Sequence, residues 1–127
     1  MVAAVKSNTN AIRAQVRKEI LAFCSSVNYK KRPTPIKYPY TIFEIKELGT
    51  EDGKTKCNLE VNIVSKNLAE AMDIADSVQD LFDHYSYLDD HCAFETYRLQ
   101  RNQVEEEDKS IERLRILFEL NYHKREV

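Results

Sequence analysis

The sequence predicts one α+β domain over residues 1–127, with a four-stranded, mainly antiparallel sheet carrying two helices on one face in the order α-β-β-α-β-β. Three observations support this fold class. Two segments place apolar residues at helical spacing, whereas other segments alternate apolar and polar residues as half-buried strands do. The 127 residues include only two glycines and three prolines, which leaves no long flexible linker to a second domain.

The first predicted helix occupies residues Ser7 to Val27. Its apolar positions are separated by steps of four, four, three and four, so they share one face of a helix. The polar run at residues 7–10 offers N-caps. The chain then enters residues 29–35, where two prolines remove backbone donors and predict a loop. The apolar stripe consists of Ile12, Val16, Ile20, Phe23 and Val27.

An antiparallel hairpin is expected next. Residues 40–45 are rich in aromatic and β-branched side chains, which favour strands. Residues 49–53 have turn chemistry, and Asp52-Gly53 suits a tight reversal. After the turn, apolar side chains alternate with polar ones, which predicts a strand with one buried face. The apolar members are Cys57, Leu59, Val61 and Ile63, and the polar ones are Lys56, Asn58, Glu60 and Asn62.

The second predicted helix begins after Asn67 and extends to about Tyr85. Asn67 and Glu70 have the spacing of a capping box. The side opposite the apolar stripe carries four aspartates, Asp73, Asp76, Asp80 and Asp83. With no lysine or arginine between Asn67 and Arg98, this face has no partner four residues away. Such a face is usually only solvated, but it is also a candidate negative surface for docking, or for lining a pore that must not hold DNA.

The last third gives a weaker signal. Residues 93–102 read as a strand, and the acidic run at residues 105–108 reads as a solvated loop. Residues 111–122 match a helix as well as a strand. The strand is favoured because five alternate positions are apolar, with charged and polar residues between them. Those positions are Leu114, Ile116, Phe118, Leu120 and Tyr122.

Composition excludes several function classes. A net charge of −2 gives no general attraction to nucleic acid or to anionic membranes. No apolar run approaches the roughly 18 residues of a membrane helix, and the start MVAAVKSNTN turns polar too early for a secretory signal. Cys24, Cys57 and Cys92 are odd in number and far apart, which indicates reduced thiols packed as small apolar residues.

No enzyme signature stands out, and no cofactor or metal is expected. The densest cluster of potential ligands is Asp83, His84 and residues 89–92, but its spacing matches no metal-binding pattern and favours a polar connection between elements. The basic cluster Lys30, Lys31 and Arg32, beside two tyrosines, could touch phosphates. A short basic loop on an acidic protein more often has no such role.

The segments together resemble a known family. Tyr38-Pro-Tyr-Thr-Ile-Phe leads through the hairpin to the strand at residues 58–66, and the Ala/Asp-rich helix at residues 68–78 follows directly. This succession resembles the tail-terminator (tail-completion, or head-to-tail joining) proteins of long-tailed phages. The likeness covers residues 7–123 in element order and is sharpest over residues 38–81.

The resemblance implies a structural virion protein of the tail or neck, assembled in the host cytoplasm. It would form a ring, commonly a hexamer, that caps the tail tube and joins it to the head connector or stopper, with DNA only passing through the lumen and no membrane partner. Assembly contacts are expected at the hairpin tip, the basic loop and the acidic loop. These residues are Gly49, Glu51, Asp52, Gly53 and Lys54; Lys30, Lys31 and Arg32; and Glu105, Glu106, Glu107 and Asp108.

Two alternatives remain open from the sequence. Another neck-ring (head-completion) protein would have similar size. A four-stranded sheet with two helices is also the build of ferredoxin-like modules that bind small ligands or RNA. The open positions of the second strand carry no aromatic side chain for stacking on bases, which counts against RNA.

Overall fold

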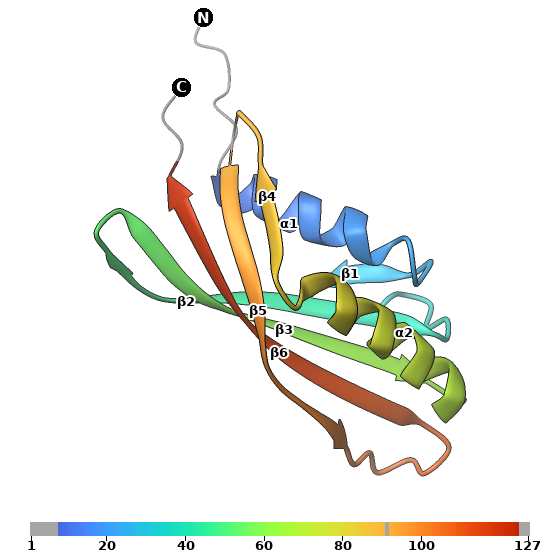
Figure 1. The fold of residues 1–127 in the computed structure, drawn as a ribbon. Helices are drawn as coiled ribbons and strands as arrows, with labels where there is room; N and C mark the ends of the chain where they lie inside the picture. The colour runs from blue at the N-terminus through green and yellow to red at the C-terminus, as the bar shows by residue number, and fades with distance from the viewer. Residues whose placement is uncertain (1–7, 91, 125–127) are drawn as a thin grey trace, which may run out of the picture.

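The computed structural model describes residues 8–90 and 92–124, which form two helices and one six-stranded sheet (Figure 1). The sheet order is β1-β2-β3-β6-β5-β4, in which β1 pairs parallel to β2 and all other neighbours are antiparallel. The elements are α1 (Asn8–Ile20), β1 (Val27–Tyr29), β2 (Tyr40–Glu51), β3 (Lys54–Ser65), α2 (Leu68–Phe82), β4 (Tyr85–Leu88), β5 (Cys92–Val104) and β6 (Glu112–Lys124).

The predicted four-stranded sheet in the order α-β-β-α-β-β is therefore wrong, because the protein has a mixed, curled six-stranded sheet. The two additional strands, β1 and β4, contain three and four residues and are too short to show a period. Each was absorbed into a helical stripe at the sequence level. Val27 lies in β1 because α1 ends at Ile20, and Tyr85 lies in β4 because Asp83 is extended and His84 has a φ of 78°.

The hairpin is confirmed. β2 and β3 pair from Tyr40↔Val64 to Glu51↔Lys54, and the two turn residues Asp52 and Gly53 have φ values of 53° and 76°. Positive φ at both positions matches the right-handed twist of the strands they join. The ambiguous last segment is a strand, as favoured, and it lies between β3 and β5 along its whole length.

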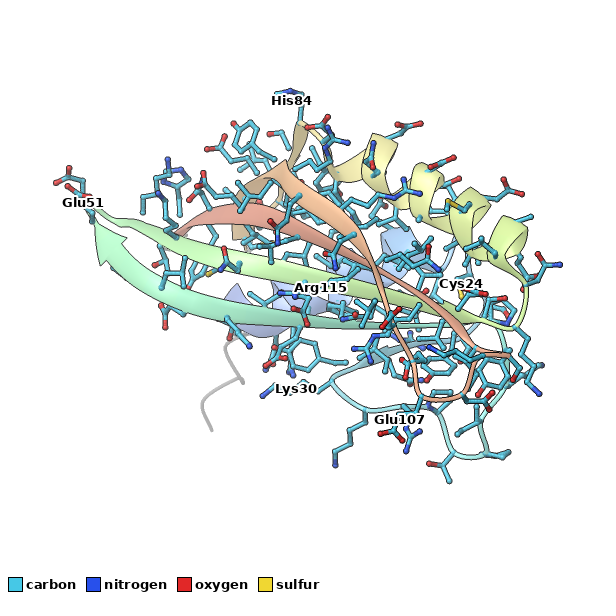
Figure 2. The ribbon with its side chains drawn as sticks, turned by 90° about the horizontal axis from the view of Figure 1, so that it is seen from below. Cys24, Lys30, Glu51, His84, Glu107 and Arg115 are labelled. Atoms are coloured by element: carbon cyan, nitrogen blue, oxygen red, sulfur yellow. The ribbon has the colours of Figure 1, made fainter. Side chains whose placement is uncertain are left out.

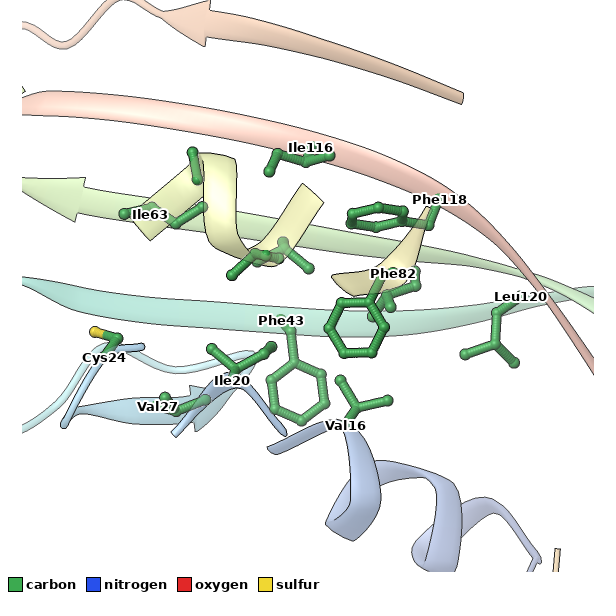
Figure 3. Packing of buried hydrophobic residues seen from close by; sticks show 14 of the residues in the cluster. Val16, Ile20, Cys24, Val27, Phe43, Ile63, Phe82, Ile116, Phe118 and Leu120 are labelled. Carbon is green, nitrogen blue, oxygen red and sulfur yellow. The ribbon is translucent and has the colours of Figure 1, made fainter. Parts of the chain in front are cut away.

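The core lies between one face of the sheet and the two helices (Figure 3). Phe82 of α2 is fully buried and packs edge-to-face against Phe118 of β6, with ring centroids 5.7 Å apart. The helix stripes and the alternating strands contribute most of the side chains that the sequence predicted, but Phe23 and Leu68 are each 38% exposed. All three cysteines are buried and unbridged, which confirms that they pack as small apolar residues.

The sheet curls until both of its edges reach α1. At one edge, Arg17 Nε donates to the Val27 carbonyl of β1 at 3.0 Å. At the other edge, Gln15 Nε2 donates to the Tyr85 hydroxyl of β4 at 3.1 Å. A single helix thus contacts the first and the last strand of the six, and α2 covers the middle of the same face (Figure 1).

Candidate functional site: the assembly surfaces

The predicted contact segments lie at opposite ends of the sheet (Figure 2). Glu51 marks the hairpin tip at one end of the sheet, whereas Lys30 lies below its middle and Glu107 toward the other end. The basic and acidic loops both flank Tyr40, whose hydroxyl is influenced by the charges of Arg32 and Glu106. Burial is the main cause that raises the pKa of Tyr40. The structure therefore brings two of the three segments together and separates the third.

The hairpin tip is exposed. Gly49, Glu51, Asp52 and Gly53 are all solvent-accessible, and Lys54 is half-buried with its Nζ 3.9 Å from Glu95 Oε1 of β5. Beside the tip lies an open pocket with a volume of about 520 Å³. Its lining includes Asn121, which is 1% exposed and whose Oδ1 receives no hydrogen bond from the described residues. The full lining is Leu48, Gly49, Thr50, Glu51, Asp52, Lys54, Lys56, Asn121 and His123.

The basic loop starts at a sharp turn after β1. Lys30 has a φ of 66°, and its N–H donates to the Phe43 carbonyl of β2 at 3.0 Å. Its Nζ lies 3.6 Å from Glu44 Oε1. Lys31 and Arg32 are exposed. The loop thus presents cations to solvent directly at the end of an edge strand.

The acidic loop is partly held by its own chain. Glu106 Oε1 lies 3.3 Å from Arg113 Nη1. Asp108 accepts hydrogen bonds from the hydroxyl and the N–H of Ser110, and these bonds lower the pKa of its carboxyl group. Glu105 and Glu107 are exposed, and neither has an ion-pair partner in the described part of the chain. Two carboxylates are thereby left available to another molecule.

The aspartate face of α2 is less bare than its sequence indicated. Asp73, Asp76 and Asp80 are exposed, whereas Asp83 is half-buried and serves as the helix C-cap. Arg101 of β5 reaches α2, with Nη1 2.7 Å from Asp76 Oδ1 and 3.0 Å from Gln79 Oε1. A search for partners four residues away could not find this contact, because its members are 25 residues apart. The candidate negative surface therefore includes one neutralised carboxylate.

The open face of the sheet is a network of polar side chains. Arg113 Nε donates to Asn62 Oδ1, and Asn62 Nδ2 donates to Glu60 Oε2. Arg115 Nε lies 2.7 Å from Glu60 Oε1, although the angle does not make a hydrogen bond. Asn121 Nδ2 donates to Glu119 and lowers the pKa of that carboxyl group. Such a face suits contact with a polar protein surface rather than base stacking.

The described members of the ligand-like cluster after α2 are not grouped as a metal site. Asp89 accepts hydrogen bonds from the Tyr87 hydroxyl at 2.7 Å and from the Cys92 N–H at 2.8 Å, so it shapes the connection between β4 and β5. His84 is exposed, with Nε2 3.8 Å from Asp83 Oδ1. His91 lies outside the described residues. Within residues 8–90 and 92–124, no three His, Cys, Asp or Glu side chains are grouped as metal ligands.

Neither helix of the described chain has the length and apolar character needed to span a bilayer. No protein-family model matches the sequence, and no curated protein matches it either.

The fold, in contrast, is shared with a solved structure. One chain of the structure titled "Virion of native gene transfer agent (GTA) particle" superposes with a TM-score of 0.68. The match covers 87% of this chain and 90% of the other, at 13% sequence identity. The similarity therefore spans nearly the whole domain of both proteins while their sequences have diverged.

Proposed function

We propose that this chain is a structural protein of a phage-like virion. The observation that carries the proposal is the near-complete fold match to a chain of a gene transfer agent particle. Fold similarity alone is a weak guide to function, so the surface has to supply a further argument.

Within the virion, the function that these features support best is tail completion. An oligomeric ring, most simply a hexamer, would cap the tail tube and join it to the head connector or stopper. A joining ring needs one contact surface for each partner, and the sheet offers exposed charged segments at two opposite ends. The hairpin tip would serve one partner, and the paired basic and acidic loops would serve the other.

The aspartate face of α2 has a separate role in this proposal. Asp73 and Asp80 are exposed carboxylates on one helix, and like charges repel the phosphate backbone of DNA. The face would either dock on a neck protein or border the DNA path. Changing both aspartates to asparagine separates these roles. A docking role predicts that the variant no longer assembles, whereas a DNA-path role predicts that it assembles normally but holds DNA within the ring.

The direct test is native mass measurement and negative-stain microscopy of the purified protein, alone and mixed with isolated tail tubes. Rings of about six subunits, or a cap at one end of the tube, are expected. A monomer that caps tubes also supports the function and means that the ring closes on its template. A protein that remains monomeric and ignores tubes would refute tail completion.

Paired charge reversals then locate the partners. Asp52→Lys with Lys54→Glu changes the tip, and Glu107→Lys with Asp108→Lys changes the acidic loop. Lys18→Glu, on the exposed side of α1, is the matched control. We expect both double variants to fold. One should lose tube capping and keep connector joining, and the other should lose connector joining and keep tube capping. Normal assembly of the loop variant would remove that loop from the contact surfaces.

The alternatives give different results in the same experiments. A head-completion protein would form rings that bind the connector but leave the tube uncapped. The ferredoxin-like regulatory module loses its basis, because the four-stranded arrangement on which it depended is not the arrangement of this protein.

A further inference from the structure

Two long strands of the sheet are covered by a neighbour over only part of their outer edge. β1 pairs with residues 41–43 of β2, and β4 pairs with residues 93–96 of β5. Within the described chain, no strand pairs with the outer edge of residues 46–51 of β2, here called the β2 free edge. The same holds for residues 98–104 of β5, the β5 free edge.

The chain satisfies each outer edge only up to the point where the free segment begins. The Tyr29 hydroxyl both accepts from the Ile45 N–H and donates to the Ile45 carbonyl, at 3.1 and 3.2 Å. On the other side, Asp83 Oδ1 accepts from the Arg98 N–H at 3.4 Å. Beyond these residues, no strand of the described chain pairs with the outward backbone groups. An unpaired edge of this kind is a template for another strand.

Both free edges also expose an apolar side chain at a register shift. The shift in β2 falls at Leu48, which is 58% exposed, and that in β5 falls at Leu99, which is 52% exposed. Bulges can protect an edge against unwanted pairing. Charged residues at these two positions would protect the edges against pairing with another strand, whereas exposed leucines favour contact with another protein.

The two free edges are complementary in charge and in direction. The β2 free edge includes one lysine and two acidic residues, and Asp52 follows directly after it. The β5 free edge includes two arginines and no acidic residue; Arg101 is already paired with Asp76, so Arg98 is the cation available to a neighbour. Because β2, β3, β6 and β5 are successively antiparallel, β5 runs opposite to β2. A neighbour in the same orientation would therefore present its β5 antiparallel to β2. With Gly49 opposite Arg101, this pairing places Glu51 opposite Arg98.

We propose that a second copy of this chain docks its β5 free edge on the β2 free edge, so that the sheets of adjacent subunits join antiparallel. The inference rests on the proposed ring and names its interface. The two surfaces differ, so the contact is heterologous and can close a ring, whereas a self-complementary contact would stop at a dimer.

The positions of β1 and β4 set the offset between neighbours. Phe43 of β2 lies level with Arg101 of β5, through Val61 and Ile116. Gly49, near the centre of the β2 free edge, lies six residues after Phe43. One of those six residues is taken up by the bulge, so Gly49 is five pairing positions from Phe43. The offset is thus about five residues, or roughly 17 Å. Across four long strands, about 19 Å wide, this corresponds to a strand tilt of about 40°, within the range of closed sheets.

The same offset accounts for the two charged loops. When the β5 free edge lies along β2, its end at Val104 approaches the point where Tyr29 of β1 ends its pairing. The acidic residue Glu105 of one subunit then faces Lys30 and Lys31 of the next. The short strands β1 and β4 abut the ends of the joint and do not overlap it.

Crosslinking tests this interface on the intact chain. The variant with Glu51→Cys and Arg98→Cys carries one reactive thiol on each free edge, while the native cysteines are buried. A short bis-maleimide should produce a ladder of oligomers that ends at the ring mass. Each single variant should give no ladder, because one chain then supplies only half of the joint. Lys18→Cys with Ala69→Cys, exposed on the two helices, is the matched control.

The outcomes separate the interface from the function. A ladder from the edge pair, absent from the single variants and the control, supports the interface. Rings seen by native mass without edge crosslinks above the control would overturn the interface and leave tail completion standing. A ladder from a protein that neither caps tubes nor binds connectors would keep the interface and refute the function. As a second readout, Glu51→Arg and Arg98→Glu should each reduce ring formation, and combining them in one chain should restore it.

Discussion

Phe82 is expected to be the single most sensitive side chain of α2. It is fully buried and makes edge-to-face contacts with Tyr85 and Phe118 at 5.3 and 5.7 Å between ring centroids. Truncation of a buried phenylalanine to alanine costs about 3–5 kcal/mol through lost transfer free energy and the cavity that remains. The two ring contacts, about 0.5–1.5 kcal/mol each, place Phe82→Ala in the upper part of that range.

Such a loss is large compared with the stability of a domain of this size, about 5–15 kcal/mol. It should lower the melting temperature by roughly 10–20 °C. The assay is urea unfolding followed by far-ultraviolet circular dichroism and by tyrosine fluorescence, which is suitable because the chain has seven tyrosines and no tryptophan. The control is Phe23→Ala, a phenylalanine that is 38% exposed and should cost about 1 kcal/mol or less.

This reasoning would be refuted if Phe82→Ala lowered the free energy of unfolding by less than about 1 kcal/mol while the slope of that free energy against urea concentration, the m-value, stayed unchanged. It would mean that α2 does not bury Phe82 against β6, and the placement of the helix on the sheet would have to be revised. A loss for Phe23→Ala equal to that for Phe82→Ala would contradict the end of α1 at Ile20.

Three further predictions concern local contacts. Asn67→Ala should destabilise the protein by about 1 kcal/mol in urea unfolding, because the Asn67 side chain accepts from the Glu70 N–H at 3.1 Å and caps α2; an unchanged midpoint would contradict the cap. The hydrogen bond to Asp89 raises the pKa of Tyr87 to about 12, so this contact stabilises the fold fully below pH 10, the ordinary value, and loses its effect as the pH rises toward 12. Absorbance titration should show a tyrosine that ionises near pH 12 and that Asp89→Asn moves to lower pH. Burial raises the pKa of Cys57 to about 11, so alkylation of the native protein at neutral pH should be slow and should become fast in urea; rapid native labelling of Cys57 would show that its strand opens readily.

The sequence predicted the long elements because their patterns repeat over many residues. β3 alternates polar and apolar residues from Lys56 to Ile63, and α2 has both a periodic apolar stripe and the Asn67 cap. The last segment was ambiguous, yet five alternating apolar positions indicated the strand correctly. In each case the local pattern coincides with the burial that tertiary packing requires.

The remaining features depend on contacts between distant segments. β1 and β4 are only three and four residues long, and each is fixed by the strand beside it rather than by its own period. The contact of Arg101 with Asp76 joins a strand to a helix and leaves no signal in spacing. The contact loops could be named from their charge, but their separation into two ends followed only from the register of the sheet.

The contact of α1 with both edge strands has a consequence for how subunits would respond to one another. Gln15 reaches β4, and Arg17 reaches β1, from positions two residues apart on the same rigid helix. A neighbour that orders one edge would reduce the motion left to α1 and so lower the entropic cost of ordering the other edge. Binding on one side of a subunit would then strengthen binding on its opposite side, and partial rings would be rare compared with free subunits and complete rings.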